Sequence, residues 1–392
     1  MPEKPLEPTD FSLVTGGPLY RLWLRMGVLR APLGLVHRRI LVMALLAWVP
    51  LLVLSLLGGV GPDGGMLFLK GLGAHVRLLV ALPILILAEL PIQRRLGNMI
   101  RRLVSHEIIP AEEVPKFNTT IQRVHRVRDS VVIELGLLMI VYTLGHWIWR
   151  EYWAQGRTSW YGVMGDSGWQ LTLAGWWYAF VSVPLFQFIF LRWVFRIGLW
   201  FWFLWRVARL NLQLIATHPD GAGGIGMVGN SAEAFGVFLL AEGVLLAGQF
   251  AQRILFEGSS LLAYKMDIFL AVLTMVSLVL APFLVFVPAL YRAKQRGRSD
   301  YGALAHTYVA EFDAKWVRKV APTEERFIGN ADIQSLADMA NSYSVVRSMR
   351  LTPFSAEVVM HLVIITVIPL LPLTLTVVPF ESVINHLIKA VL

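Results

Sequence analysis

Four ionisable residues fall inside apolar stretches of the sequence, where they could bind or relay ions. Glu89, Glu134, Glu242 and His361 each lie within a run of apolar residues. A charged side chain that faces lipid is costly, so such groups face the interior of a helix bundle or water and find partners there. We therefore predict these four residues as permeation or coupling groups.

Glu242 lies nearest to the middle of its run, in the segment AEGVLLAGQ, beside Gly243 and Gly248. Small residues let helices pack closely, and they can also leave room for water beside a carboxylate. No basic residue is expected at the same depth. Glu242 is thus predicted either to be buried with its proton and donate one hydrogen bond, or to stand in a hydrated cavity as a coupling group.

Arg192 and Arg196 lie four residues apart, which places them on one face of a helix. Glu89 and Glu134 are expected at a similar depth. A structural ion pair between these glutamates and arginines is therefore the alternative to a permeation role. For His361, near the start of its run, an interfacial or packed position is the alternative to proton relay.

The segment THPDGAGGIG, residues 217–226, is an irregular polar loop between two apolar stretches. Its candidate residues are His218, Asp220, Gly221, Gly223, Gly224 and Gly226. The simplest interpretation is a turn after a helix, with glycines supplying positive φ angles. The alternative is a pore lining or a nest of N–H groups that binds an anion. A dinucleotide site is excluded because no strand precedes the glycines. A metal site is not expected, because His218 and Asp220 supply only two ligands.

The composition indicates a membrane protein. Of 392 residues, 56% are hydrophobic and 16% are charged, whereas soluble domains carry about 25% charged residues. Several apolar runs reach about 20 residues, which is enough to cross a bilayer. We predict an all-α, polytopic transmembrane helical bundle with seven spans. They lie at about 40–60, 76–92, 131–149, 171–194, 231–254, 267–290 and 357–379.

Basic residues cluster before the first span and after the second, fourth and sixth spans. With seven spans, all four clusters fall on one side, so the N-terminus is expected in the cytoplasm and the C-terminus outside. The net charge of +9 is explained by this bias and by contact with anionic lipids of the bilayer. No nucleic-acid partner is expected.

Four segments follow from this layout. Residues 1–39 form a cytoplasmic N-terminal segment with an amphipathic interfacial helix. Residues 40–290 hold spans one to six, with a cytoplasmic helical loop at 94–130 and an extended helix at 195–216. Residues 291–354 form a cytoplasmic helical segment in which Arg347 and Arg350 are candidate contacts for a partner or lipid. Residues 355–392 hold the last span and a short C-terminal helix.

Two of these segments carry a resemblance. THPDGAGGIG, together with IGNADIQSLADMANSYSVVRSMRLTPFS at 328–355, resembles segments of an uncharacterised family of bacterial multi-pass membrane proteins. The resemblance implies a bacterial cytoplasmic (inner) membrane location, and it implies no activity.

The function expected from the residues is membrane transport. Intramembrane carboxylates, proline-broken helices and the glycine-rich loop favour an ion channel or an ion-coupled transporter for an inorganic ion, formed by a homo-oligomer. The alternative is a non-conducting scaffold or sensor whose basic cytoplasmic helices bind a partner or anionic lipid. An enzyme is not expected, because no nucleophile–base set, ATP motif or metal-ligand spacing occurs. No cofactor is expected.

Overall fold

The computed structural model describes residues 11–58, 64–153, 159–165, 168–318, 320 and 329–376. The predicted short helix after the last span lies outside the described residues, as does the start of the N-terminal segment. In the described part of the chain, which is mainly helical, one antiparallel pair of strands forms, β1 (Gly162–Gly165) and β2 (Gly168–Leu171). The predicted all-α class is confirmed.

Seven helical runs of the described chain are long and apolar enough to cross a membrane, as predicted. They are Val36–Leu57, Leu72–Ser105, Val131–Glu151, Leu173–Val207, Gly226–Glu257, Leu261–Val317 and Ala356–Thr376. A span needs about 20 residues because the hydrocarbon core is about 30 Å thick and each helical residue rises 1.5 Å. Several of the runs are longer than a span requires.

Within the runs, α-helices alternate with short π-helical or 3-10 turns. The first run is α2 (Val36–Leu57). The second contains α4 (Leu72–His75), η3 (Val76–Ala81), α5 (Leu82–Leu87) and α6 (Glu89–Ser105). The third contains α8 (Val131–Ile140), η5 (Val141–Gly145), α9 (His146–Ile148) and η6 (Trp149–Trp153). The fourth run contains α10 (Leu173–Trp177), η7 (Tyr178–Ser182) and α11 (Val183–Val207). The fifth contains α12 (Gly226–Asn230), η8 (Ser231–Phe235) and α13 (Gly236–Glu257). The sixth run contains η9 (Leu261–Tyr264), α14 (Lys265–Leu280), η10 (Ala281–Phe286), α15 (Val287–Phe312) and η11 (Asp313–Val317). The seventh contains α17 (Ala356–Val367) and η12 (Ile368–Thr376). Between the runs lie α1 (Pro18–Arg25), α3 (Gly64–Leu69), η4 (Ala111–Glu113), α7 (Val114–Arg128) and α16 (Ala331–Ser348).

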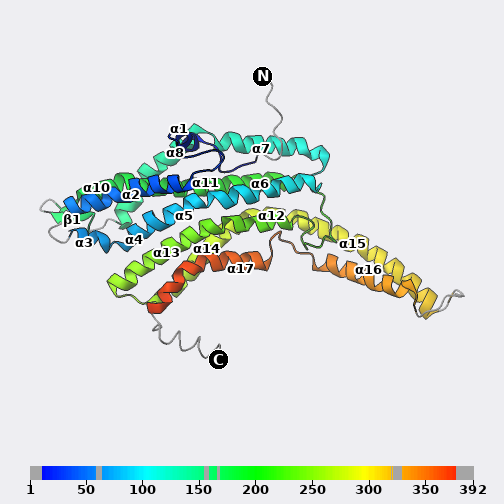
Figure 1. Cartoon of the computed structure of the whole chain (residues 1–392). Helices are drawn as coiled ribbons and strands as arrows, with labels where there is room; N and C mark the ends of the chain where they lie inside the picture. The colour runs from blue at the N-terminus through cyan, green and yellow to red at the C-terminus, as the bar shows by residue number, and fades with distance from the viewer. Residues whose placement is uncertain are drawn as a thin grey trace, which may run out of the picture.

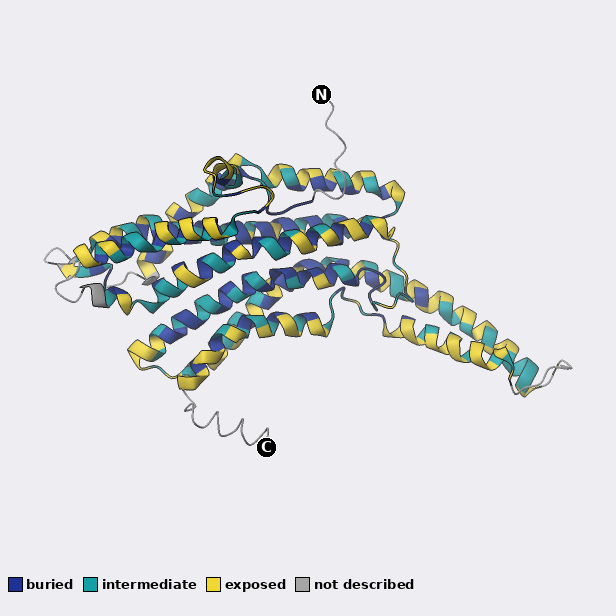
Figure 2. Ribbon diagram, viewed as in Figure 1, coloured by how far each residue is buried: buried dark blue, intermediate teal, exposed yellow. Residues whose placement is uncertain are grey.

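The spans run side by side as one bundle (Figure 1). Helix α11 packs against η10, α7 and α5, and α13 packs against α17, η12 and η3. Buried residues follow these contacts, whereas the outer faces are exposed (Figure 2). We call the end that carries β1 and β2 the strand end, and the opposite end, from which α15 and α16 project, the polar end.

The chain before the first span packs into the bundle. Phe11 is buried in contact with Trp200 and Phe203, and Arg128 Nη1 donates a hydrogen bond of 2.7 Å to the carbonyl of Ser12. A helix is present in the N-terminal segment as α1, with its proline in the first turn as expected, and its position at the membrane interface stays a prediction. These early residues help to position the charged groups described below.

The helix predicted at 195–216 ends earlier than expected. Helix α11 stops at Val207, and residues 208–216 form turns and extended chain. In this stretch Gln213 N donates to Ile108 O at 2.9 Å. Tertiary bonds of this kind replace the bonds of a continuing helix, so packing overrides the local helix propensity.

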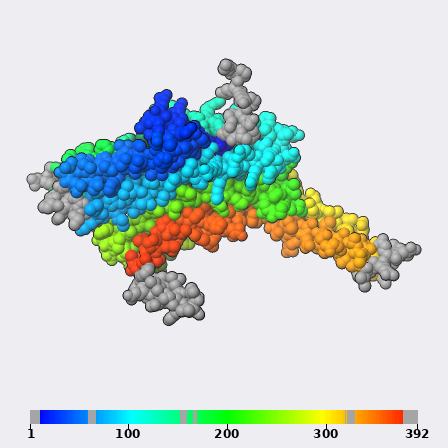
Figure 3. Space-filling model, viewed as in Figure 1, coloured from blue at the N-terminus to red at the C-terminus, as the bar shows by residue number. Residues whose placement is uncertain are grey.

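The longest continuous helix of the described chain belongs instead to the sixth span, which has 57 residues. At 1.5 Å per residue it is roughly 85 Å long, far more than the hydrocarbon thickness. Its outer part, α15, pairs with α16 as a hairpin that projects from the bundle (Figures 1 and 3). Most of this hairpin is exposed (Figure 2), as expected for the polar segment 291–354.

Candidate functional site

Buried charges connect α2, α6 and α11. Glu89, the first residue of α6, accepts a hydrogen bond of 3.0 Å from Arg196 Nη2, and its other oxygen accepts one from Arg39 Nη1. Each of these residues is at most 5% exposed. Because an unpaired charge is costly inside an apolar bundle, the shared carboxylate holds the three helices together.

A second ion pair lies one helical turn away on α11. Arg192 Nη2 is 3.4 Å from Glu134 Oε1, and the backbone N–H of Leu19 donates to Glu134 Oε2 at 2.8 Å. Both predicted arginines therefore meet a predicted glutamate, as the ion-pair alternative expected. We call the following residues the charged core: Arg39, Glu89, Glu134, Arg192 and Arg196.

Arg39 is the member that the sequence prediction missed. It belongs to the basic cluster before the first span, yet it is only 1% exposed. The buried residues of α2 are Arg39, Met43, Ala47, Leu51 and Ser55, each four positions after the last. Residues at this spacing share a helix face, and Arg39 falls on the face that also carries the small residues Ala47 and Ser55. That shared spacing is the signal in the sequence that could have marked Arg39 as buried.

Glu242 lies on the interior face of α13 and is 9% exposed. Its Oε1 atom is buried without a hydrogen-bond partner, and no cation of the described chain lies within ion-pair distance. Its neighbour Gly243 lies against the carbonyl of Thr366, and Gly248 lies against Val76, closely enough that an added Cβ would collide. The small residues thus serve close packing, and the carboxyl remains unpaired.

Irregular helices surround this part of α13. It packs against the π-helical turn η3 and against the 3-10 segment η12, which contains Pro369 and Pro372. Single π turns occur often at functional sites, and proline-broken helices free carbonyl groups. The surroundings of Glu242 therefore depart from regular helix on two sides.

His361 lies apart from Glu242, at the polar end. Its Nδ1 atom is 3.2 Å from Glu233 Oε1, and Glu233 Oε2 accepts a hydrogen bond of 2.8 Å from Arg95. The side chains of His361 and Arg95 are 61% and 51% exposed. This arrangement is a surface cluster that joins α6, η8 and α17, and it does not bring His361 to the other candidates.

The glycine-rich loop is closed by its own aspartate. The Asp220 carboxylate accepts hydrogen bonds from the backbone N–H groups of Ala222, Gly224 and Gly226, at 2.8, 3.1 and 2.8 Å. Gly223 and Gly224 have φ angles of 66° and 97°, which other residues rarely adopt. The predicted nest of N–H groups is present, but the anion that fills it is the side chain of Asp220.

This loop favours the ionised form of Asp220. Burial alone raises the pKa of the carboxyl, but hydrogen bonds from Ala222, Gly226 and Gly224 stabilise the carboxylate and hold its pKa below the usual value. His218 Nδ1 lies 2.9 Å from Asp220 Oδ1. Among the described residues, no three His, Asp or Glu side chains converge as a metal site would require.

The two segments that carry the family resemblance touch each other here. Arg350 donates its backbone N–H to Gly221 O at 2.7 Å and its Nη2 to Asp220 O at 2.8 Å. We call residues 217–226 with Arg350 the clasp. It fastens the chain between α16 and α17 to the loop before α12. Arg347, the other predicted contact residue, is exposed on α16.

Comparison with family models, with curated proteins and with solved structures gives no match for this chain. The resemblance of the two segments therefore stays a prediction.

Proposed function

We propose that this multi-pass membrane protein transports an inorganic ion and that transport depends on reversible protonation of Glu242. The observation that carries the proposal is the contrast between Glu242 and the charged core. Every charged residue of that core has an ion-pair partner, whereas the Glu242 carboxyl has none among the described residues. A buried carboxyl without a partner is tolerated in its neutral form and becomes costly when it ionises.

Such a group can couple a proton to a conformational change. Loss of the proton would place an unpaired charge against η3, η12 and α17, and water or a cation would have to reach it. The irregular turns around α13 support this idea, because freed carbonyls and proline kinks provide both ligands and hinges. The glycine-rich loop has no part in the proposed path, since Asp220 occupies its N–H groups.

Chemical labelling tests the protonated state of Glu242 directly. Dicyclohexylcarbodiimide reacts with protonated carboxyl groups in apolar surroundings. We expect peptide mass spectrometry to find it on Glu242 but not on the paired Glu89, with less labelling as pH rises. In liposomes that contain the purified protein, an imposed pH gradient should drive ion flux through the wild type, and Glu242→Gln should abolish this flux.

The matched control is Glu233→Gln, which removes a carboxylate from the partly exposed cluster at the polar end of the same run. That variant should keep its flux. Flux that survives Glu242→Gln in a folded, purified protein would refute the proposal, as would the absence of labelling on Glu242 at acidic pH.

A second candidate is a non-conducting scaffold or sensor. The projecting α15–α16 hairpin favours it, because an exposed helical arm outside a bundle can hold a partner (Figure 3). Absence of flux in every tested ion gradient would support this candidate over transport.

We also propose a bacterial inner-membrane location with the polar end in the cytoplasm. The sequence has no cysteine, so a single introduced cysteine gives an unambiguous label. In intact spheroplasts, an impermeant maleimide should label Met164→Cys on β1 at the strand end and should reach Ser299→Cys on α15 only after lysis. The reverse pattern would contradict this orientation.

A further inference from the structure

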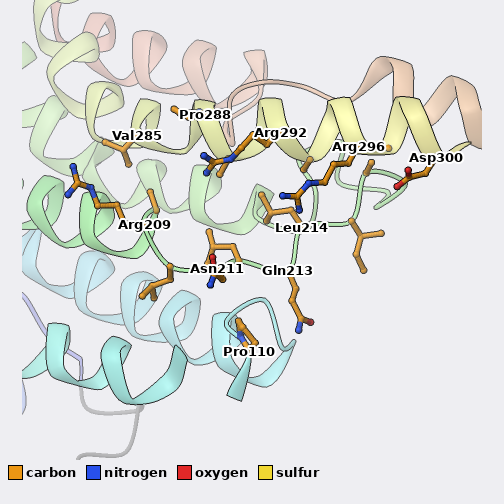
Figure 4. Close-up of a pocket in the computed structure, with 18 of the residues that line it drawn as sticks. Pro110, Arg209, Asn211, Gln213, Leu214, Val285, Pro288, Arg292, Arg296 and Asp300 are labelled. Atoms are coloured by element: carbon orange, nitrogen blue, oxygen red, sulfur yellow. The ribbon is translucent and has the colours of Figure 1, made fainter. Parts of the chain in front are cut away.

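A groove of about 1410 Å³ opens at the polar end between α15 and the extended segment 208–216 (Figure 4). Arg292 and Arg296 project from α15 into the space in front of the extended segment that carries Asn211 and Gln213 (Figure 4). The groove is larger than the 300–1,000 Å³ typical of small-ligand pockets. It can therefore hold a ligand with both a head and a tail.

The helix wall of the groove changes character along its length. At intervals of four residues the chain reads Leu284, Pro288, Arg292, Arg296 and Asp300, and all five line the groove. On α15 this spacing places the last four, from Pro288 to Asp300, on one side of the helix, about 6 Å apart along the axis. The wall thus passes from apolar to cationic within a few turns, in the order in which a bilayer passes from acyl chains to headgroups.

The cations in the groove are available to a ligand. Arg292 and Arg296 are exposed, and neither forms an ion pair or a hydrogen bond within the described chain. On the opposite wall Arg209 lies over the ring of Trp205, 3.7 Å from its centroid. The acidic residues of the lining, Glu112 and Asp300, form no ion pair with these arginines. Planar guanidinium groups one turn apart suit the oxygens of a phosphate.

The apolar end of the groove is open to the surface of the bundle. Leu284 is 48% exposed on η10, within the sixth span, and Val285 and Trp205 also line the groove. A free phosphate would use only the cationic half of this site. A phospholipid would use both halves.

We propose that this groove binds an anionic phospholipid, with the phosphate between Arg292 and Arg296 and an acyl chain along Leu284 and Trp205. The proposal is independent of the role of Glu242. It predicts selectivity for phosphatidylglycerol over phosphatidylcholine, because the choline head brings a cation that the arginines repel.

The test measures lipid binding to the purified full-length protein by native mass spectrometry, with phosphatidylglycerol, phosphatidylcholine and inorganic phosphate as separate probes. Each cation near a membrane surface contributes about a fivefold gain in binding of anionic lipid. We therefore expect Arg292→Gln/Arg296→Gln to weaken phosphatidylglycerol binding by about 30-fold. Arg126→Gln/Arg298→Gln, which removes the same charge from exposed positions outside the groove, should have little effect.

Two further readings decide between lipid and free phosphate. Leu284→Ser should weaken binding of long-chain phosphatidylglycerol but not of its short-chain form. Inorganic phosphate that binds as tightly as the lipid, with the same dependence on Arg292 and Arg296, would overturn the lipid proposal. Equal losses in the groove variant and the control variant would overturn the site itself.

Discussion

Glu89→Gln should cause the largest loss of stability of any single substitution in the charged core. The substitution keeps the size of the side chain but leaves both Arg39 and Arg196 without a counter-charge, although each is at most 4% exposed. Removing one partner of a buried ion pair costs about 3–5 kcal/mol. We expect a much lower melting temperature in detergent and poor recovery from membranes.

Glu233→Gln is the matched control, because it breaks an ion pair with Arg95 whose side chain is 51% exposed. Exposed pairs contribute about 0–1 kcal/mol, so this variant should melt close to the wild type. Equal melting temperatures for Glu89→Gln and wild type would show that the charged core does not hold the spans together.

A compensating variant separates lost charge from lost packing. Arg39→Met/Glu89→Leu/Arg196→Met removes all three charges and keeps side chains of similar volume. Replacing a buried ionic group by apolar residues is often neutral or stabilising. We therefore expect the triple variant to recover most of the stability that Glu89→Gln loses.

Asp220→Ala should open the clasp. It removes the acceptor of three backbone N–H groups, and hydrogen bonds to a charged group are worth about 1.5–3 kcal/mol each. Hydrogen exchange should become faster in residues 217–226 and, because Arg350 bonds to two carbonyls of the loop, in residues 346–354 as well. Asp300→Ala, an exposed aspartate on α15, is the control and should leave exchange unchanged.

The hydrogen bonds to the Asp220 carboxylate also determine how the stability of the loop changes with pH. Because the folded state lowers the pKa of Asp220, its contribution to stability is complete above the unfolded pKa of about 4. It is lost as the pH falls through the still lower pKa of the folded state. Protection of the loop, corrected for intrinsic exchange rates, should thus be constant from neutral pH to about pH 5 and fall only in stronger acid. Loss of protection near neutral pH would contradict this account.

The sequence alone determined the number of spans and the all-α class. The length of an apolar run is a local property of the sequence, and the bilayer thickness sets the length that a spanning helix needs. It also offered the pairing of Arg192 and Arg196 with Glu89 and Glu134 as the alternative to a permeation role, since unpaired charges are not tolerated within a bundle. The seven runs and both ion pairs are present in the structure. Local sequence patterns were sufficient for these features because one energetic cost, that of exposing polar groups to the apolar layer, dominates each of them.

Tertiary structure decided the rest. Helix α11 ends at Val207 because residues 208–216 bond to a distant connection, which no local pattern contains. Arg39 enters the core because the packing of α2 buries the face that carries it. The glycine-rich loop is closed by Asp220 and fastened by Arg350, 130 residues away along the chain. Such pairings depend on which surfaces meet when the helices assemble, and only the folded bundle specifies that.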